Sequence, residues 1–353
     1  MPTALHKHIL TLATATMLLT FLLIVVGAAT RVYDAGMACP DWPHCYGYYI
    51  PFPESKIPGG YIVQGQHYTW WQVLLEWGHR TLAALVGVGL LALWGTTALA
   101  ATKITNRASV NPFIRVPAFL PLLTATLLLA LQIKLGAITV WWSNAPWTVM
   151  VHLGNAMLFF AALVWLRRVL LSERSELSKS ATRRSSKQSE SVGGPVTTPL
   201  PIHLLAITFA LSIWLTMLIG GYTSSSGSGG VCGGLFTCLG QWWVSPKVDL
   251  QQHIHMQHRL WALITTALSI ALVILAKRTA PHLRKAALHA HIMLWGQITL
   301  GIATLYSFEY YPSLYYPLSI AHLAWGTLLF TAAIGLLLNI YYGVQSRPHT
   351  NKS

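Results

Sequence analysis

The feature that most constrains this chain is a series of long apolar runs with almost no charged side chain. An uncharged apolar run of about 20 residues is the length of helix that crosses the hydrocarbon core of a bilayer. Only 9% of the 353 residues are charged, against about 25% in an ordinary soluble domain. We therefore exclude a soluble globular protein and predict an all-α membrane protein with eight transmembrane helices. The runs lie at Ile9–Ala29, Val73–Ala101, Phe113–Leu135, Thr148–Leu166, Ile202–Gly220, Leu260–Ala276, Ala286–Leu305 and Leu318–Ile340.

The lysine and arginine residues collect on one side of these predicted helices. The net charge is +14, and 17 of the 23 basic residues fall near the two termini or in the connections after the second, fourth and sixth helices. Basic loops stay in the cytoplasm, so this distribution predicts that both termini are cytoplasmic. Because membrane sidedness accounts for the positive charge, we expect membrane lipid and no nucleic acid as a partner.

A Ser-rich basic segment divides the chain into two copies of one design. Residues 172–200 contain few apolar side chains, so we predict a flexible cytoplasmic linker between an N-terminal four-helix bundle, 1–171, and a C-terminal one, 201–353. Both halves would enter the membrane from the same side, which predicts parallel, pseudo-symmetric repeats related by an axis along the membrane normal. Five pairs of identical residues recur 193 positions apart: Gly27 and Gly220, Thr30 and Thr223, Gly36 and Gly229, Cys39 and Cys232, and Cys45 and Cys238.

Each predicted bundle has one histidine near the outer end of its second helix and another near the outer end of its fourth. The pairs are His79 with His152 and His258 with His322. A lone histidine would more simply hydrogen-bond a neighbouring helix, but four at repeat-related positions indicate a functional site. Zinc needs three or four ligands, and the second half has no thiol or carboxylate at a convincing spacing. Haem needs only axial ligands, so the pairs predict haem in the core of each bundle.

Charged residues beside these histidines distinguish the two halves. Arg80 and Arg259 directly follow a histidine, and each guanidinium is a candidate partner for a haem propionate or an anchor at the interface. Glu76 lies three residues before His79, on the same helix face, whereas the second half has His255 there. A buried carboxylate suits proton transfer or stabilisation of positive charge, unless it only forms a salt bridge with Arg80. The first bundle is therefore predicted to be the reactive one.

The cysteines fall in the predicted outer loops. In an oxidising compartment each pair would form either a structural clasp or a redox-active disulfide. No nucleotide-binding motif occurs in a strand-turn-helix context, so electrons are expected to come through haem, thiols or quinone. His253 and His255 are candidates for an auxiliary axial ligand or for a His-rich helix start. The cysteine pairs are Cys39 with Cys45 and Cys232 with Cys238.

These motifs together resemble the haem A synthase family. The resemblance rests on Gly27–Arg31, the Cys39–Cys45 loop, the Glu76–Arg80 motif, the His152-Leu153 pair and their second-half partners. It covers nearly the whole chain outside the linker and the tail. It implies an eight-helix protein of the bacterial inner membrane that oxidises the methyl group at position 8 of haem O to a formyl group. In the family, two hydroxylations give a gem-diol that loses water, and the product, haem A, serves terminal oxidases.

The resemblance also implies a role for each matching residue. His79 and His152 would ligate the substrate haem O, with Glu76 assisting the reaction, and His258 and His322 would ligate a haem b that relays electrons. Each cysteine pair would form a disulfide. Haem O synthase, quinone and a second copy of the chain are candidate partners. The rival functions are a bis-histidine cytochrome b that only transfers electrons and a membrane haem carrier.

Overall fold

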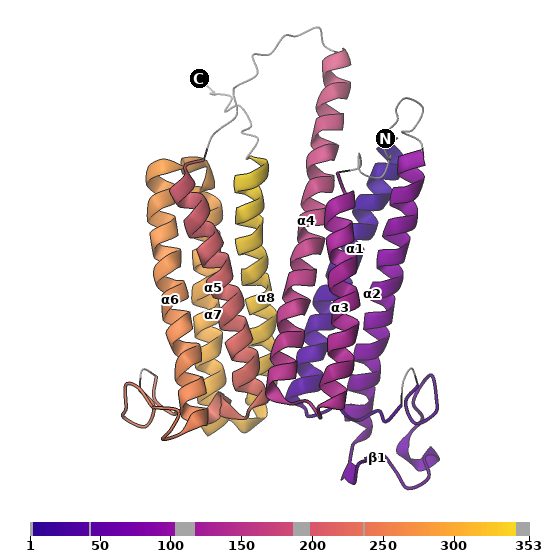
Figure 1. Ribbon diagram of the computed structural model, residues 1–353, viewed down its shortest axis with the longest axis vertical. Coiled ribbons are helices and arrows are strands. Elements are labelled where there is room, and N and C mark those ends of the chain that lie inside the picture. Colours follow the sequence, from indigo (N-terminus) through magenta and orange to yellow (C-terminus); the bar gives the residue numbers. More distant parts are fainter. Residues whose placement is uncertain (1–2, 42–43, 103–116, 186–197, 236, 344–353) are drawn as a thin grey trace.

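Eight long helices dominate a computed structural model of this protein (Figure 1). The structure describes residues 3–41, 44–102, 117–185, 198–235 and 237–343. All eight helices are long and apolar enough to cross a membrane, which confirms the predicted all-α membrane fold. The helices are α1 (Thr3–Val32), α2 (Trp70–Thr102), α3 (Phe119–Trp141), α4 (Pro146–Ser185), α5 (Leu200–Ser225), α6 (Leu250–Thr279), α7 (Arg284–Tyr310) and α8 (Pro312–Tyr342).

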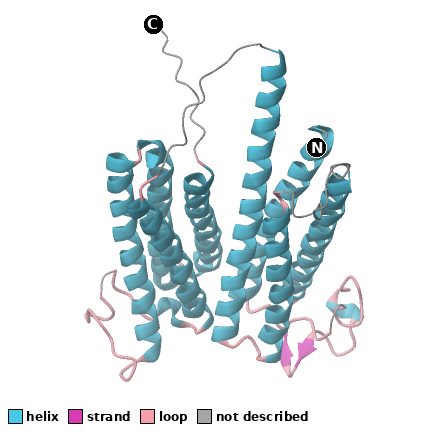
Figure 2. Ribbon diagram, turned by 45° about the horizontal axis from the view of Figure 1, so that its top comes forward, coloured by secondary structure: helices cyan, strands magenta, loops and turns pink. Residues whose placement is uncertain are grey.

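The helices form two groups of four, α1 to α4 and α5 to α8, which stand side by side (Figures 1 and 2). Helices α1 and α5 begin at the same end of the molecule, so the two groups run parallel. At their boundary α1 and α4 contact α5 and α8. There the guanidinium of Arg31 donates a hydrogen bond of 2.9 Å to the carbonyl oxygen of Ser224, which lies 193 residues later in the chain.

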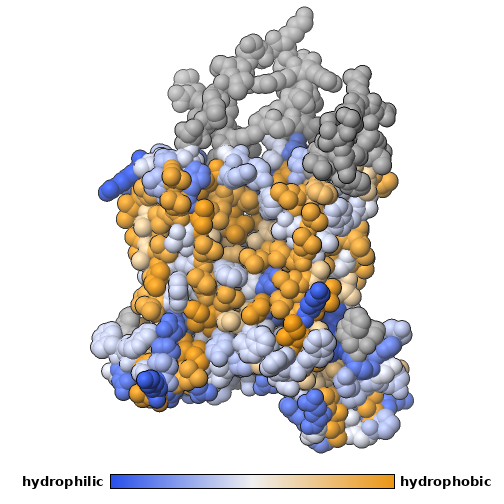
Figure 3. Space-filling view, viewed as in Figure 1, coloured by the Kyte–Doolittle hydropathy of each residue, from blue (hydrophilic) through white to orange (hydrophobic). Residues whose placement is uncertain are grey.

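Apolar side chains lie both inside the protein and on its outer surface. Met157 and Phe160 of α4 pack in one buried cluster with Phe209 of α5 and with residues of α6, α7 and α8. On the outside Leu91 is 72% exposed and Leu127 is 63% exposed, and Figure 3 shows a broad hydrophobic band around the helices. Such a band is unfavourable in water and suits the hydrocarbon of a bilayer. The chain is therefore a multi-pass membrane protein.

The loops at the end opposite the termini differ in length between the two groups. The connection from α1 to α2 contains a 3₁₀ turn, η1 (Glu54–Lys56), and an antiparallel hairpin of β1 (Ile62–Val63) and β2 (Gln66–His67). It packs around Tyr61, which is fully buried. The connection from α5 to α6 is shorter and contains η2 (Ser228–Gly230). At the other end of the helices, η3 (Pro281–Leu283) joins α6 to α7.

Of the eight helices, α4 and α6 extend furthest beyond their predicted bounds. Helix α4 continues to Ser185, so the prediction of an unstructured linker is wrong for residues 172–185. No Gly or Pro interrupts the chain between Gly154 and Gly193, and the intervening residues tolerate a helix. Helix α6 begins ten residues before Leu260, because the side chain of Asp249 accepts a 2.9 Å hydrogen bond from the amide of Gln252 and caps the helix. The rest of the predicted linker, 186–197, and the predicted start of the third helix, 113–116, lie outside the described residues.

Candidate functional site

The first histidine of each bundle lies against a glycine of the preceding helix. A Cβ atom at Gly27 of α1 would lie 2.9 Å from Cε1 of His79 on α2, and one at Gly220 of α5 would lie 2.8 Å from Cε1 of His258 on α6. Real Cβ atoms essentially never make contacts under 3.0 Å. Only glycine therefore allows each helix backbone to approach its imidazole this closely.

The second histidine of the first bundle is held by a glycine and an amide from α3. A Cβ atom at Gly136 would lie 3.3 Å from Cε1 of His152 on α4. The amide Nε2 of Gln132 lies 3.1 Å from Nε2 of His152. Asn155 donates a 2.6 Å hydrogen bond to Oε1 of Gln132 and so orients that amide. The imidazole of His152 thus lies within a polar network between α3 and α4.

The second bundle repeats this arrangement between α7 and α8. A Cβ atom at Gly301 would lie 3.0 Å from Cε1 of His322, and the amide Nε2 of Gln297 lies 3.1 Å from Nε2 of His322. The sequence analysis did not identify Gln132 or Gln297 as site residues. The sequence feature that could have identified them is the Gln-x-x-x-Gly spacing, which occurs in both halves. Residues four apart lie on one helix face, so each glutamine is on the same face as the glycine beside the histidine.

The imidazoles of His258 and His322 in the second bundle lie close to each other. The ring centroids of His258 and His322 are 6.4 Å apart. Two imidazoles bound to opposite sides of one ion would have ring centres about 6 Å apart, given metal–nitrogen bonds of about 2 Å. No group of three or more His, Cys, Asp or Glu residues suited to a metal ion occurs in the described part of the chain. The separation of the two rings would be compatible with ligation of a haem iron by both imidazoles.

Unpartnered nitrogen atoms support the same fit. The Nδ1 atoms of His79, His258 and His322 are buried, and none of them has a hydrogen-bond partner among the residues that the structure describes. A buried polar atom without a partner is costly. The burial of these rings therefore needs a favourable interaction that the surrounding side chains do not supply, and ligation of a metal is such an interaction.

The carboxylate of Glu76 lies on α2 beside His79. Glu76 is only 4% exposed. Both oxygens of its carboxylate have a partner. Oε1 is 2.5 Å from Nη2 of Arg80 in an ion pair, and Oε2 accepts a 2.7 Å hydrogen bond from the backbone amide of Cys39. The spacing of three and four residues places Glu76, His79 and Arg80 on one face of α2. Two charge-assisted hydrogen bonds thus fix a buried carboxylate one turn from an imidazole.

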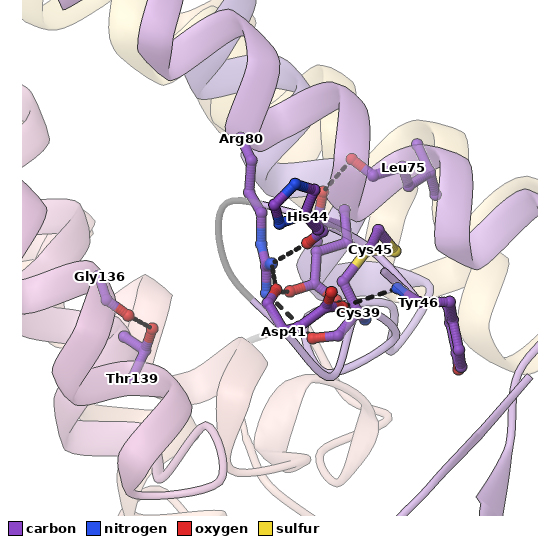
Figure 4. A network of polar contacts seen from close by, with 11 residues as sticks. Cys39, Asp41, His44, Cys45, Tyr46, Leu75, Arg80, Gly136 and Thr139 are labelled. Carbon is purple, nitrogen blue, oxygen red and sulfur yellow. Dashed lines mark hydrogen bonds and ion pairs between the residues drawn. A yellow bond between two sulfur atoms is a disulfide. The ribbon is translucent and has the colours of Figure 1, made fainter. Parts of the chain in front are cut away.

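The two arginines that follow a histidine both contact an outer loop. Figure 4 shows Arg80 extending from α2 to the loop, where it donates hydrogen bonds of 2.5 Å to the carbonyl of Asp41 and 3.1 Å to that of Cys39. Arg259 donates a 2.9 Å hydrogen bond to the carbonyl of Cys232. Among the described residues, Arg259 has no carboxylate partner. Pairing of either guanidinium with a propionate stays a prediction.

A disulfide closes the outer loop of each bundle. The bonds join Cys39 with Cys45 and Cys232 with Cys238. Each loop continues with an antiparallel backbone bridge, from Cys45 to Tyr48 in the first half and from Cys238 to Gln241 in the second. Because the amide of Cys39 holds Glu76, the first disulfide loop is in direct contact with the buried carboxylate.

Tyr46 in the first loop is a residue that the sequence analysis missed. Its hydroxyl is buried without a hydrogen-bond partner in the described part of the chain. Burial, together with the nearby phenol of Tyr68 and carboxylate of Glu76, raises the pKa of Tyr46 to about 12. The residue 193 positions later is Leu239, which is 70% exposed. The difference between the two repeats at this position was the available signal.

The raised pKa of Tyr46 predicts how stability responds to alkaline pH. An unfolded tyrosine ionises near pH 10 and folded Tyr46 near pH 12, so its contribution to stability is present below pH 10 and is lost as the pH rises to about 12. We expect Tyr46→Phe to weaken the fall in melting temperature over this range. Thermal unfolding at a series of pH values measures it, with Tyr48→Phe, a more exposed loop tyrosine, as control. An equal fall in both variants would contradict the prediction.

The two additional histidines of α6 have partners in the outer loop. Nδ1 of His255, at the position equivalent to Glu76, lies 2.9 Å from the carbonyl oxygen of Ser228. Nδ1 of His253 lies 2.8 Å from the carbonyl oxygen of Val244. Both rings therefore have a polar partner in the loop between α5 and α6.

The glycine contacts predict a steric test of the second bundle. Gly220→Ala would force the ring of His258 to move, because the new Cβ atom would lie 2.8 Å from Cε1. We expect a loss of about 1–3 kcal/mol in the free energy of unfolding, measured as a lower melting temperature. Gly335→Ala on α8 is the control, since nothing lies within 4 Å of its added Cβ atom. Equal melting temperatures for the two variants would show that the contact is unimportant.

The fold and the site define a class of protein: multi-pass helical membrane proteins with two groups of four helices, a disulfide-closed loop in each group and a close pair of histidine rings in the second. Within this class, residues 10–334 match the family model of the COX15-CtaA cytochrome oxidase assembly proteins. The match covers most of the chain, and the protein belongs to this family.

Several bacterial proteins named heme A synthase are similar to this chain over most of its length. The protein of Shewanella oneidensis is 27% identical over 325 residues, which cover 82% of this chain and 85% of the relative. The protein of Jannaschia sp. is 25% identical over a match that covers 80% of this chain and 76% of the relative. The protein of Shouchella clausii is 24% identical over a match that covers 86% of this chain and 89% of the relative.

Proposed function

We propose that this protein is a haem A synthase, an oxidoreductase that converts the C8 methyl group of haem O to a formyl group by successive hydroxylations. Family membership and the names of the relatives support the class of reaction. The observation that carries the proposal is the buried carboxylate of Glu76 beside His79, because its repeat equivalent is His255 and only one bundle has this acid. The first bundle is therefore the site of reaction.

In the first bundle, His79 and His152 bind the iron of the substrate haem O. Glu76 then stabilises the positive charge that develops on the methyl carbon as it is oxidised. Its carboxylate needs no reorganisation during the reaction, because Arg80 and the amide of Cys39 already hold both oxygens. Gly27 keeps the ring of His79 against α1 and limits its rotation.

In the second bundle, His258 and His322 would hold a haem b. When bound, that haem would supply one-electron relay between the first bundle and an external electron carrier. Gln297 and Gly301 orient the ring of His322, and Gly220 orients that of His258. Because His255 replaces the carboxylate, this bundle holds its haem without modifying it.

The protein acts in the bacterial inner membrane with both termini in the cytoplasm. The excess of lysine and arginine near the termini and in the connections on their side supports this orientation. Both disulfides lie at the opposite end, which then faces the oxidising compartment. A haem O synthase as the source of substrate, quinone as the electron carrier and a second copy of the chain are its proposed partners.

Pigment analysis tests the function. The full chain is expressed in cells that make haem O but have no other haem A synthase, then purified, and its extracted haems are separated by chromatography and identified by mass. We expect haem A or hydroxylated haem O, together with haem b. Unmodified haem O and haem b alone would identify the rival bis-histidine cytochrome b and overturn the proposal. Cells without haem O are the control and should yield haem b only.

A further inference from the structure

A groove of about 420 Å³ lies between α1 and α4, toward the end of the molecule that carries the termini. Aliphatic side chains of Leu10, Leu18 and Leu171 line it, together with the guanidinium groups of Arg167 and Arg174. Arginines inside or at the edge of a membrane-spanning helix are costly unless they have a polar partner. The groove thus combines an apolar wall with two positive charges, each of which requires a polar partner.

The guanidinium group of Arg167 is oriented by a threonine of α1. Nε of Arg167 donates a 3.2 Å hydrogen bond to Oγ1 of Thr14, and that hydroxyl in turn donates to the carbonyl oxygen of Leu10 at 2.8 Å. Thr14 thereby orients Arg167 and uses only one of its five N–H groups. Neither Arg167 nor Arg174 forms an ion pair with any carboxylate in the described residues.

The depth of the groove follows from the positions of its residues along the helices. Phe21 of α1 and Phe160 of α4 contact each other, with ring centroids 6.3 Å apart. Thr14 and Arg167 each lie seven residues, or two turns, from that pair in the direction of the termini. Arg174 lies two turns further, about 10 Å along α4. The groove therefore runs from the apolar interior of the membrane toward the level of the lipid headgroups.

We propose that this groove binds an anionic phospholipid, with its phosphate at Arg167 and Arg174 and an acyl chain along Leu10 and Leu18. A phosphate accepts paired hydrogen bonds from the free N–H groups of a guanidinium, and basic pockets between membrane helices suit anionic headgroups. A purely apolar occupant, such as the prenyl tail of a haem, would contact the leucines and leave both positive charges unpaired. The charge of the groove thus favours the anionic lipid.

Native mass spectrometry of the full chain in detergent tests this site. The protein is mixed with equal amounts of phosphatidylglycerol, which is anionic, and phosphatidylethanolamine, which is zwitterionic. We expect the wild-type protein to retain phosphatidylglycerol about tenfold more than phosphatidylethanolamine, which corresponds to about 1.4 kcal/mol. The double variant R167Q/R174Q should lose this preference. The control R278Q removes an exposed arginine from the last turn of α6. This variant should keep the preference for phosphatidylglycerol.

The outcomes decide between occupants. Equal retention of the two lipids by the wild-type protein, or an unchanged preference in R167Q/R174Q, would overturn the proposal. Displacement of phosphatidylglycerol by added haem O would identify a prenyl tail as the occupant and would also overturn it. The variant R167K/R174K keeps both charges and should retain the preference. Circular dichroism and the melting temperature show that each variant is folded, so a loss of binding is not a loss of structure.

Discussion

Replacing Glu76 with glutamine is expected to lower haem A formation by at least about 100-fold, the size of effect seen when one preorganised electrostatic group is removed from an active site. Glutamine has nearly the same shape and can still accept a hydrogen bond from the amide of Cys39, but it carries no charge. The positive charge that develops on the methyl carbon would then lack its stabilising partner. Haem A formed per bound haem O is the quantity to measure, because it separates the reaction from substrate binding.

The control for this variant is Glu54→Gln, which removes an exposed carboxylate from the loop between α1 and α2. We expect normal haem A formation in that variant. Because Glu76 also contacts Arg80 and Cys39, the content of bound haem and of loop disulfide is compared in both variants. Full activity of E76Q with normal haem content would remove the carboxylate from the mechanism.

The second large effect is expected in the other bundle. In the double variant H258A/H322A, we expect the haem b content to fall at least about tenfold, since both histidines proposed to hold its iron would be lost. The Soret absorbance of the purified protein, together with extraction of haem b, measures this. Haem A formation should fall with it, because electrons could no longer pass through the second bundle.

His253→Ala is the matched control on the same helix. Its imidazole contacts the carbonyl of Val244 in the loop, so its removal should leave haem b content unchanged. Loss of haem b from H253A together with its retention in H258A/H322A would show that a different histidine provides the ligand. In that case the centroid distance of 6.4 Å between His258 and His322 would have to reflect helix packing alone.

The two bundles have opposite expected phenotypes, and this separates their roles. E76Q should keep its haem b and bind haem O without converting it. H258A/H322A should keep its first bundle intact and fail because electrons could no longer be relayed through the second bundle. A protein that only transferred electrons would be insensitive to the E76Q change, because a carboxylate beside one haem is not required for electron transfer.

Much of the fold was predictable because the membrane makes it a local property of the chain. An apolar run of about 20 residues must form a helix in a bilayer, where every backbone polar group needs a partner within the segment. The eight helices were therefore predicted from the apolar runs of the sequence alone. Their ends were less predictable: the cap at Asp249 extends α6 by two to three turns of polar helix that contain His253 and His255.

The candidate site was only partly predictable. The repeat identified the four histidines and the cysteine pairs, because the same residue types recur in both halves of the chain. Glu76 was identified because the second half has His255 at the equivalent position. Gln132, Gln297 and Tyr46 were missed, because their significance comes from the ring or the buried pocket beside them.

By itself, then, the sequence determined that this is a membrane protein with eight helices, that its two halves repeat, and that one half has an acid where the other has a histidine. Only the tertiary structure decided what each of these side chains contacts. Glu76 and Cys39 are 37 residues apart on different segments, and their 2.7 Å hydrogen bond exists because the loop folds back over α2. Hydropathy acts within one segment of chain, whereas a hydrogen-bond partner depends on the distance between segments, which packing alone sets.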